Sequence, residues 1–311
     1  MKPSALRFLV CPACHGELDL RADRRDAEVS EGILACRQCR RAYPVIRGVP
    51  RFVAERTYAS SFGDQWNWFR KVQLDSWSGT RESETTLEAT TGWRDADYVG
   101  RLVLDAGVGA GRFAEVVARK GGEVVGIDLT TAADAAYANI GRLDKVHVVQ
   151  ADIFAMPFRE RTFDLAYSIG VLHHTPDPRA AFDRVAAAVK KGGGFAVYVY
   201  ARYGSAHRVA DVVRRLTTRL PRRLMLALSA VAIPLYYVYR VRGLGEALRL
   251  FFAISMHPNW RWRWLDTFDW YTPRYQWKFL YPEVFGWFRA NGFLDVEVFD
   301  GPIRMRGVKT S

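Results

Sequence analysis

Four cysteines have the spacing of a metal site. They are the only cysteines among 311 residues and form two C-x-x-C pairs, Cys11 with Cys14 and Cys36 with Cys39. Two such turns can present four thiolates to one tetrahedral zinc ion, as in a zinc ribbon. Because four thiolates leave no open coordination position, we expect a structural ion rather than a catalytic one. In so short a segment, metal binding contributes much of the folding free energy.

A glycine-rich segment is the second chemical signal. It reads VLDAGVGAGR at 103–112, between an apolar run and a helical pattern. Gly107, Gly109 and Gly111 allow the backbone to turn tightly and to approach a ligand. A dinucleotide loop has the spacing G-x-G-x-x-G, whereas G-x-G-x-G after Asp105 leaves a carboxylate near the loop. A carboxylate there suits a cationic ligand better than a pyrophosphate.

Polar residues also follow the next apolar runs. Asp128 ends VVGID, the position at which a doubly wound fold hydrogen-bonds ribose hydroxyls. Asp152 follows VVQA, and His173 and His174 follow the run at 163–168. A neutral imidazole at that edge can remove a proton from a hydroxyl or an amine. The alternative is structural, with one histidine packed beneath the cofactor and the other orienting a loop.

A sheet of parallel strands covered by helices must position these residues. From 95 to 200, apolar runs alternate with helical patterns, which predicts a doubly wound α/β fold. The expected strands are 102–105, 123–128, 146–150, 163–168 and 194–200, and the expected helices include 112–120 and 178–190. Asp177 before Pro178 is expected to cap a helix rather than to act in catalysis. A helix at 282–291 and strands at 294–300 and 303–309 follow.

With these motifs in order, the chain resembles the class I S-adenosylmethionine-dependent methyltransferases. FDLAYSIGVLHHTPDP at 163–178 and VKKGGGFAVYVY at 189–200 complete the match. The resemblance implies a Rossmann-like seven-stranded sheet and S-adenosylmethionine as cofactor, with Asp152 facing the adenine amino group and a backbone contact from Ile153. Val108 departs from the family, which more often has Cys, Ser or Thr there. The implied cofactor-binding residues are Asp105, Gly107, Gly109, Gly111, Asp128, Asp152, Ile153 and Ser168.

The same resemblance limits the classes of substrate that we expect. The form SIGVLHHT is similar to the branch that acts on small molecules, quinones, lipids and natural products. No Asp/Asn-Pro-Pro-aromatic signature stands there, so the amino-methylating DNA and RNA enzymes are poor matches. If all four cysteines bind zinc, no thiol remains for covalent attack on a pyrimidine.

The first 55 residues resemble the small zinc-ribbon domain that occurs alone as a methyltransferase activator and fused to some bacterial methyltransferases. CPAC, CRQC and YPVIRGVPRF carry this resemblance. The expected organisation is a zinc ribbon at 1–55 with ligands Cys11, Cys14, Cys36 and Cys39, a linker with cofactor-covering helices at 56–94, a cofactor-binding core at 95–200, a helical cap at 201–270 and a C-terminal helix with closing strands at 271–311.

The positive charge is concentrated in the expected cap. Residues 201–265 contain 12 arginines and only 2 acidic residues, within a chain of net charge +12. The uncharged run 224–239 is flanked by arginines, is shorter than the about 20 residues of a membrane-spanning helix, and is interrupted by Pro234. Three readings remain open: peripheral contact with a membrane through 205–256, a buried cap over the active site, or a homodimer interface.

Aromatic and basic residues alternate at 259–281. Similar D-W-Y-x-P-x-Y-Q segments in the methyltransferase group imply a wall of the acceptor pocket. Such aromatics can hold a hydrophobic acceptor, face a sulfonium, stack RNA bases, or simply pack the cap. The candidate acceptor-site residues are Asp269, Tyr271, Arg274 and Tyr275.

Together these features predict methyl transfer to an O, N or C nucleophile on a hydrophobic or membrane-associated small molecule. The rivals are an rRNA or tRNA methyltransferase whose ribbon binds RNA, and a catalytically idle scaffold that binds a partner. A composition with 49% hydrophobic and 25% charged residues excludes a disordered or collagen-like chain. The N-terminal segment shows no apolar signal region, and paired cysteines suit a reducing compartment, so we expect the cytoplasm, with peripheral contact at the inner face of the membrane.

Overall fold

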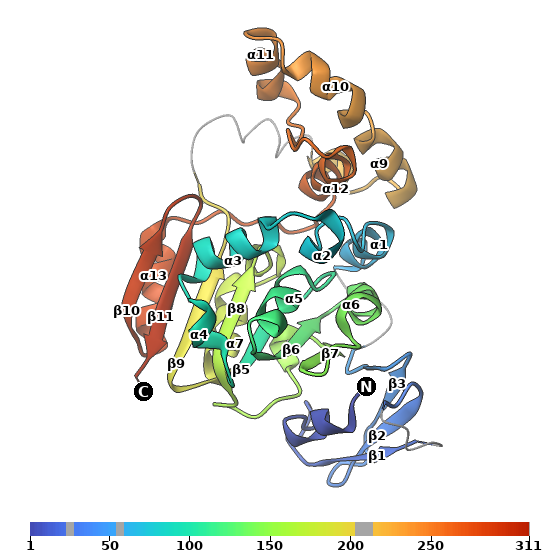
Figure 1. Cartoon of the computed structure of the whole chain (residues 1–311), viewed down its shortest axis with the longest axis vertical. Coiled ribbons are helices and arrows are strands. Elements are labelled where there is room, and N and C mark those ends of the chain that lie inside the picture. Colours follow the sequence, from blue (N-terminus) through green and yellow to red (C-terminus); the bar gives the residue numbers. More distant parts are fainter. Residues whose placement is uncertain (23–27, 54–58, 203–213, 311) are drawn as a thin grey trace. The chain divides into compact units, whose positions relative to one another are not determined.

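The chain forms two compact units, each described here by itself. The computed structural model describes residues 1–22, 28–53, 59–202 and 214–310. The first unit combines Met1–Ala201 with Gln276–Ser311, and the second is Arg202–Tyr275 (Figure 1).

A small antiparallel sheet forms the N-terminal part of the first unit. Its strands lie in the order β1 (Leu18–Arg21), β2 (Gly32–Cys36), β3 (Ala42–Ile46) and β4 (Val49–Pro50), after a short 3-10 helix η1 (Pro3–Arg7). The first cysteine pair lies in the turn before β1, and the second lies at the end of β2 and in the turn that follows. The two turns therefore bring both pairs to one end of this sheet.

A seven-stranded sheet forms the centre of the first unit and confirms the expected fold class. Its order is β10-β11-β9-β8-β5-β6-β7. Strands β5 to β9 are parallel, whereas β11 pairs antiparallel with both β9 and β10. The strands are β5 (Leu102–Ala106), β6 (Glu123–Asp128), β7 (Val146–Gln150), β8 (Phe163–Ile169), β9 (Val189–Tyr198), β10 (Phe293–Phe299) and β11 (Arg304–Lys309). Because strand order reverses between β5 and β8, a ligand crevice is expected at their carboxyl ends.

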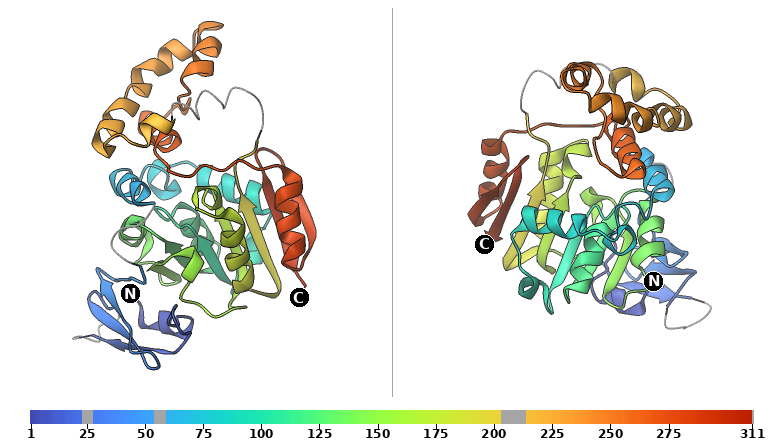
Figure 2. Two further views of the ribbon diagram at one scale, coloured as in Figure 1. Left: turned by 180° about the vertical axis from the view of Figure 1, so that it is seen from behind. Right: turned by 45° about the horizontal axis from the view of Figure 1, so that its top comes forward.

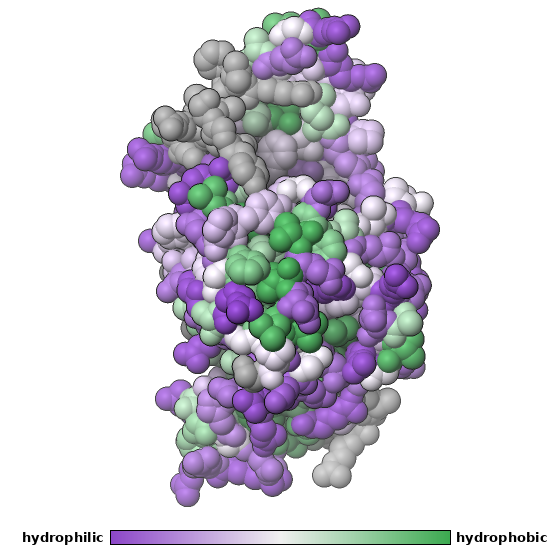
Figure 3. Space-filling view, turned by 90° about the vertical axis from the view of Figure 1, so that its left-hand side faces the viewer, coloured by the Kyte–Doolittle hydropathy of each residue, from purple (hydrophilic) through white to green (hydrophobic). Residues whose placement is uncertain are grey.

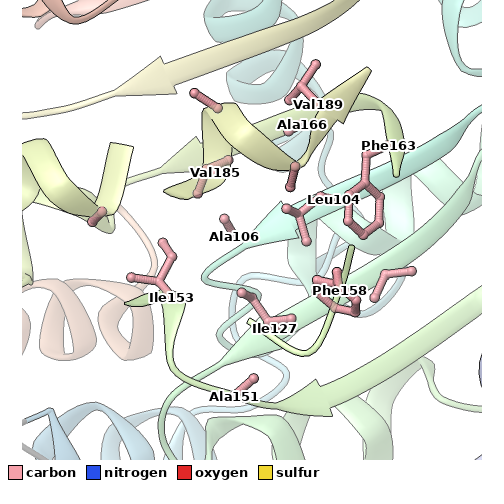
Figure 4. Close-up of a cluster of buried hydrophobic side chains, with 14 of the residues drawn as sticks. Leu104, Ala106, Ile127, Ala151, Ile153, Phe158, Phe163, Ala166, Val185 and Val189 are labelled. Atoms are coloured by element: carbon pink, nitrogen blue, oxygen red, sulfur yellow. The ribbon is translucent and has the colours of Figure 1, made fainter. Parts of the chain in front are cut away.

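Helices cover both faces of this sheet (Figures 1 and 2). Alternate residues of each strand pack to opposite sides, so that Val103 joins one buried cluster and Leu104 the other. Figure 4 shows part of the second cluster, with Leu104 and Ile127 from the strands and Val185 from α7. One side carries α3 (Glu82–Thr91), α4 (Asp95–Tyr98), α5 (Arg112–Arg119) and α6 (Ala132–Ile140); the other carries α7 (Pro178–Ala188) and α13 (Tyr281–Ala290).

The expected boundaries were wrong at one junction. Helix α7 ends at Ala188 and β9 begins at Val189, although the helical pattern predicted a helix to residue 190. Val189 is fully buried and pairs with Phe163 of β8, so a contact with a distant strand decides its conformation. At the start of α7, Asp177 accepts a hydrogen bond from the Ala180 amide at 3.0 Å, which confirms the predicted helix cap.

The N-terminal sheet is joined to the edge strand β7. Arg51, directly after β4, pairs in parallel with Gln150, and the Phe52 amide donates to the Gln150 carbonyl at 2.8 Å. The Arg51 guanidinium also lies 2.6 Å from Oδ1 of Asp134 in α6. This edge of the large sheet is therefore extended by the N-terminal segment.

The opposite edge strand, β10, bears apolar side chains. Figure 3 faces the side of the first unit with β10 and β11, where apolar groups gather among polar ones. Leu294, Val298 and Val308 are exposed in these strands. The pairing register of β10 shifts between Leu294 and Glu297, and such a bulge hinders pairing of an edge with another strand.

The second unit is helical. Its helices are α9 (Arg222–Ser229), α10 (Ala232–Tyr239), α11 (Leu244–Phe251) and α12 (Trp260–Tyr271). Two small clusters hold it together, one around Phe268 and Met225 and one around Tyr239 and Ile254. The apolar run 224–239 is divided between α9 and α10. None of the helices described here is long and apolar enough to cross a membrane.

Candidate active site

The glycine-rich loop follows β5 at its carboxyl end. The Gly107 and Val108 amides donate to the Ile127 carbonyl at 3.0 and 2.8 Å, and the Gly109 amide donates to Oδ2 of Asp128 at 3.1 Å. Gly107 and Gly111 have φ angles of 110° and 93°, which disfavour any residue with a Cβ. The loop is therefore tied to the end of β6, next to the first candidate acid.

Neighbouring side chains pack directly on this loop. A Cβ at Gly107 would lie 2.2 Å from Val171, and a Cβ at Gly109 would lie 3.2 Å from the ring of Trp66. Trp66 belongs to α1 (Ser60–Trp68), so this helix packs on the glycine-rich loop, while the cofactor-covering role of the segment 56–94 stays a prediction. The glycines serve close packing as well as the turn.

Asp105 lies beneath the loop, not in the open crevice. Its side chain is buried, and Oδ2 accepts a hydrogen bond from the Tyr167 hydroxyl at 3.0 Å. Burial raises the pKa of this carboxyl from 3.8 to about 7; the Tyr167 hydrogen bond opposes this rise and the negative charge of Asp128 adds to it. A cation bound near the loop would favour the ionised form.

Two further acids stand at the ends of adjacent strands. Asp128 ends β6 half-buried, and its Oδ1 accepts hydrogen bonds from the Thr130 amide and hydroxyl at 2.8 and 2.7 Å. Burial raises the pKa of Asp128, while its hydrogen bonds to Thr130 and Gly109 oppose the rise. Asp152 follows β7 and caps a short helix η2 (Ile153–Ala155) through a 3.0 Å bond from the Phe154 amide. Both carboxylates keep lone pairs for ligand hydroxyl or amino groups.

Ser168 has a structural contact. Its side chain is fully buried in β8 and donates to the Ala106 carbonyl of β5 at 2.8 Å. The hydroxyl therefore links two strands at the point where their order reverses. The expected contact of Ser168 with the cofactor stays a prediction.

The two histidines differ in their surroundings. They lie in the 3-10 helix η3 (Leu172–His174) after β8. The His173 ring is fully buried, stacks on Tyr200 with ring centroids 3.9 Å apart, and has no hydrogen-bond partner at either nitrogen among the described residues. Burial holds the pKa of His173 well below 6.5, so the ring is neutral at pH 7. A buried imidazole without a hydrogen-bond partner is unusual and requires an explanation, such as a bound water or ligand.

Aromatic side chains surround these histidines. The ring of Phe62 in α1 lies 5.1 Å from that of His174, and the Trp277 indole donates to the Thr175 carbonyl at 3.0 Å. The Trp277 amide also donates to the His173 carbonyl at 2.9 Å. Sequence reasoning did not single out Tyr200 or Trp277, and only their nonlocal contacts identify them.

The four cysteines come together as expected. Their sulfur atoms all lie within 4.8 Å of one another, with 3.6 Å between Cys11 and Cys39 and 3.4 Å between Cys14 and Cys36. Sulfur ligands about 2.3 Å from a tetrahedral zinc ion lie about 3.8 Å apart, so the arrangement fits zinc. The Tyr43 hydroxyl lies 3.1 Å from the Cys11 sulfur and can stabilise a thiolate.

The acceptor-site candidates Asp269, Tyr271, Arg274 and Tyr275 belong to the second unit, whereas His173 and His174 belong to the first. Tyr271 is buried, stacks on Phe252, and donates its hydroxyl to the Ala253 carbonyl at 2.9 Å. The alternative of ordinary packing therefore accounts for Tyr271. Arg274 is exposed, with its guanidinium 5.5 Å from the Tyr275 ring centroid.

Comparisons with known proteins match two parts of the chain. Residues 104–197 match the family described as "Methyltransferase domain", and residues 2–48 match "Trm112p-like protein". Residues 104–197 thus form a methyltransferase domain, as the sequence motifs predicted. More particularly, the chain joins that domain in one polypeptide to a Trm112p-like domain.

Individual relatives share only part of the chain. It is similar to the ubiquinone biosynthesis O-methyltransferase of Paracidovorax citrulli, with 34% identity over 33% of this chain and 45% of that protein. It is also similar to the sterol 24-C-methyltransferase of Saccharomyces cerevisiae, with 38% identity over 32% of this chain and 27% of that protein. The chain therefore spans less than half the length of either relative.

Among solved structures, one similar chain comes from the complex between the Haloferax volcanii Trm112 methyltransferase activator and the putative methyltransferase. The identity is 14%, the coverage is 80% of this chain and 98% of that chain, and the TM-score is 0.47.

Proposed function

We propose that the protein transfers a methyl group from S-adenosylmethionine to an O, N or C nucleophile of an apolar small molecule. The observation that carries the proposal is the arrangement at the carboxyl edge of the sheet. There the glycine-rich loop, Asp128 and Asp152 stand at the ends of neighbouring strands, and His173, with its unpartnered ring, follows the next strand.

The acids and the loop fit the proposed cofactor. Asp128 binds the ribose hydroxyls, Asp152 accepts from the adenine amino group, and the backbone of the loop lies against the methionine portion. When it is ionised, Asp105 beneath the loop attracts the positive charge of the sulfonium, whereas it would repel a pyrophosphate. The bound group supplies an electrophilic methyl on a sulfonium.

His173 is the proposed base. Methyl transfer breaks the sulfur–carbon bond, whose electron pair stays on sulfur, and forms a bond between the carbon and the acceptor atom. The proton of that acceptor atom then passes to a ring nitrogen of His173; the ring is neutral, and its nitrogens have no hydrogen-bond partner within the described part of the chain. His174 is the second candidate. Tyr200 holds the His173 ring by stacking and so limits its rotation.

An apolar small molecule is the proposed acceptor class. The relatives named for ubiquinone biosynthesis and for sterol methylation support this choice. The aromatic rings of Phe62 and Trp277 near the histidines favour an apolar acceptor over a highly charged one. Asp269, Arg274 and Tyr275 remain proposed acceptor contacts.

Calorimetry with S-adenosylmethionine tests the cofactor site. Replacing Asp128→Ala removes a charged acceptor for two ribose hydroxyls, so we expect affinity to fall at least about tenfold. Asp144→Ala changes an exposed acid elsewhere in the same unit and is the matched control. Unchanged affinity in a folded Asp128→Ala protein would refute the assignment of Asp128 to the cofactor site. A wild-type protein that does not bind S-adenosylmethionine would favour the alternative of a catalytically idle scaffold.

Two measurements test the base and the acceptor. His173→Gln should lower kcat at least about 100-fold while cofactor affinity stays constant, and the loss should shrink at high pH, where the acceptor ionises unaided. The acceptor is tested by native mass spectrometry followed by extraction of small molecules, which identifies any lipid or quinone that the purified protein retains. If the protein methylates RNA and its affinity for RNA falls steeply with salt, the acceptor is RNA and the proposal of a small-molecule acceptor is wrong.

A further inference from the structure

The outer faces of α9 and α10 are apolar where a surface helix is normally polar. On α9, Met225 and Ser229 are buried against the rest of the second unit, while Leu224 and Leu228 are 44% and 46% exposed. Val231 continues this row at 46%. The spacing of four and three residues places Leu224, Leu228 and Val231 on one helical face. This face is apolar and exposed, whereas the exposed face of a surface helix is normally polar.

Exposed apolar side chains also occur on α10 and just beyond it. Ala232 and Tyr239 are buried, whereas Tyr237 is 69% and Val241 is 53% exposed. Tyr combines an apolar ring with a polar hydroxyl, which suits the boundary between water and lipid. Leu216, 67% exposed, extends the apolar row before α9.

The charges within residues 214–245 have a single sign, and Glu246 in the first turn of α11 is the next acidic residue along the chain. Residues 214–245 contain seven arginines and no acidic residue. Arg219 and Arg223 are exposed before and at the start of α9, and Arg240 and Arg242 are exposed after α10. An apolar helical face bordered by arginines matches the chemistry of an anionic lipid surface, in which leucines enter the acyl boundary and arginines meet phosphate groups.

We infer that α9 and α10 dock the protein on the surface of an anionic lipid bilayer. The exposed apolar residues Leu216, Leu224, Leu228, Val231, Tyr237 and Val241 form the docking face, with the exposed arginines at its border. The inference rests on the proposed function in one respect, because docking gives the enzyme access to an acceptor dissolved in the membrane.

Other occupants fit the docking face less well. A second copy bound through the same face would bring two sets of arginines together without an acidic partner from 214–245. A nucleic acid would satisfy the arginines but would leave the leucine row in contact with phosphates and water. Of these three occupants, only an anionic lipid surface offers both an apolar phase and negative charge.

Vesicle co-sedimentation tests the docking face. The full-length protein, without cofactor, should sediment with vesicles of phosphatidylcholine and phosphatidylserine, weakly with phosphatidylcholine alone, and less as salt rises. Each arginine near an anionic surface strengthens binding about fivefold. Replacing two of them, Arg219→Gln with Arg223→Gln, should therefore lower the partition coefficient between vesicles and water about 25-fold at low salt. Leu224→Ser with Leu228→Ser should lower it further, including at high salt.

A matched control uses similar residues on the first unit. Arg142→Gln with Leu143→Ser changes an exposed arginine and a leucine that is 43% exposed, and it should leave vesicle binding unchanged. Asp128→Ala should also bind vesicles normally, so failure of the cofactor site and failure of docking are distinguishable.

Three results would overturn the inference. The first is an absence of vesicle binding, or binding that both docking-face variants leave intact. The second is that the protein binds RNA in a salt-dependent way but does not bind vesicles, and that Arg219→Gln with Arg223→Gln abolishes the RNA binding. The third is a dimer in sedimentation equilibrium that Leu224→Ser with Leu228→Ser dissociates while vesicle binding is absent.

Discussion

Asp105→Asn should make the stability of the protein less dependent on pH. The wild-type carboxyl is buried, and its pKa in the folded state is about 7 against 3.8 in ordinary surroundings. Between these values the folded state binds more protons than the unfolded state. The free energy of unfolding therefore falls as pH rises from about 4 to about 7, and then levels off.

The size of the effect follows from the same shift. About three pKa units at about 1.4 kcal/mol each correspond to about 4 kcal/mol of destabilisation at pH 8 relative to pH 4. Asparagine has nearly the same shape, and its amide oxygen can still accept the Tyr167 hydrogen bond. The variant should therefore gain stability over the wild type as pH rises, by up to about 4 kcal/mol.

Urea unfolding at half-unit steps from pH 4 to pH 8 measures this difference. Subtracting wild type from variant cancels all other titrating groups, and Asp144→Asn, at an exposed acid, should give a flat difference. A flat difference for Asp105→Asn would refute the reasoning. Cofactor affinity adds a second readout, because a bound cation favours the ionised carboxyl: wild-type affinity should rise with pH through about 7, whereas the variant should show no such rise.

Three further predictions concern the parts that support the site. Removal of zinc by a chelator, or Cys36→Ser, should lower the melting temperature, which calorimetry measures; an unchanged value would show that the ribbon folds without metal. Arg51→Ala leaves Asp134 without its ion pair and should cost about 2 kcal/mol in urea unfolding, whereas Arg41→Ala on the surface should cost little. Asp177→Ala should cost about 1 kcal/mol and Asp177→Asn much less, and equal losses would contradict the capping role.

Local patterns predicted the elements that carry the site. The strands at 123–128 and 146–150 agree with β6 and β7, because each apolar run is bounded by polar or glycine residues. The cysteine pairs are also local, since each turn sets two ligands by spacing alone. The junction at Val189 could not be found in this way, because the helical pattern continues while strand pairing with Phe163 overrides it.

The sequence alone determined which residues can do chemistry and in which order they follow the strands. Spacing along the chain determines the ligand pairs, the tight turn at Gly107 and the acids at the ends of strands, because each depends on a few neighbouring residues. Only the tertiary structure decided that Asp105 is desolvated, that the His173 nitrogens have no hydrogen-bond partner among the residues that the structure describes, and that Arg51 joins the edge of the sheet. Desolvation and edge pairing depend on residues far apart in the chain, so no local pattern contains them.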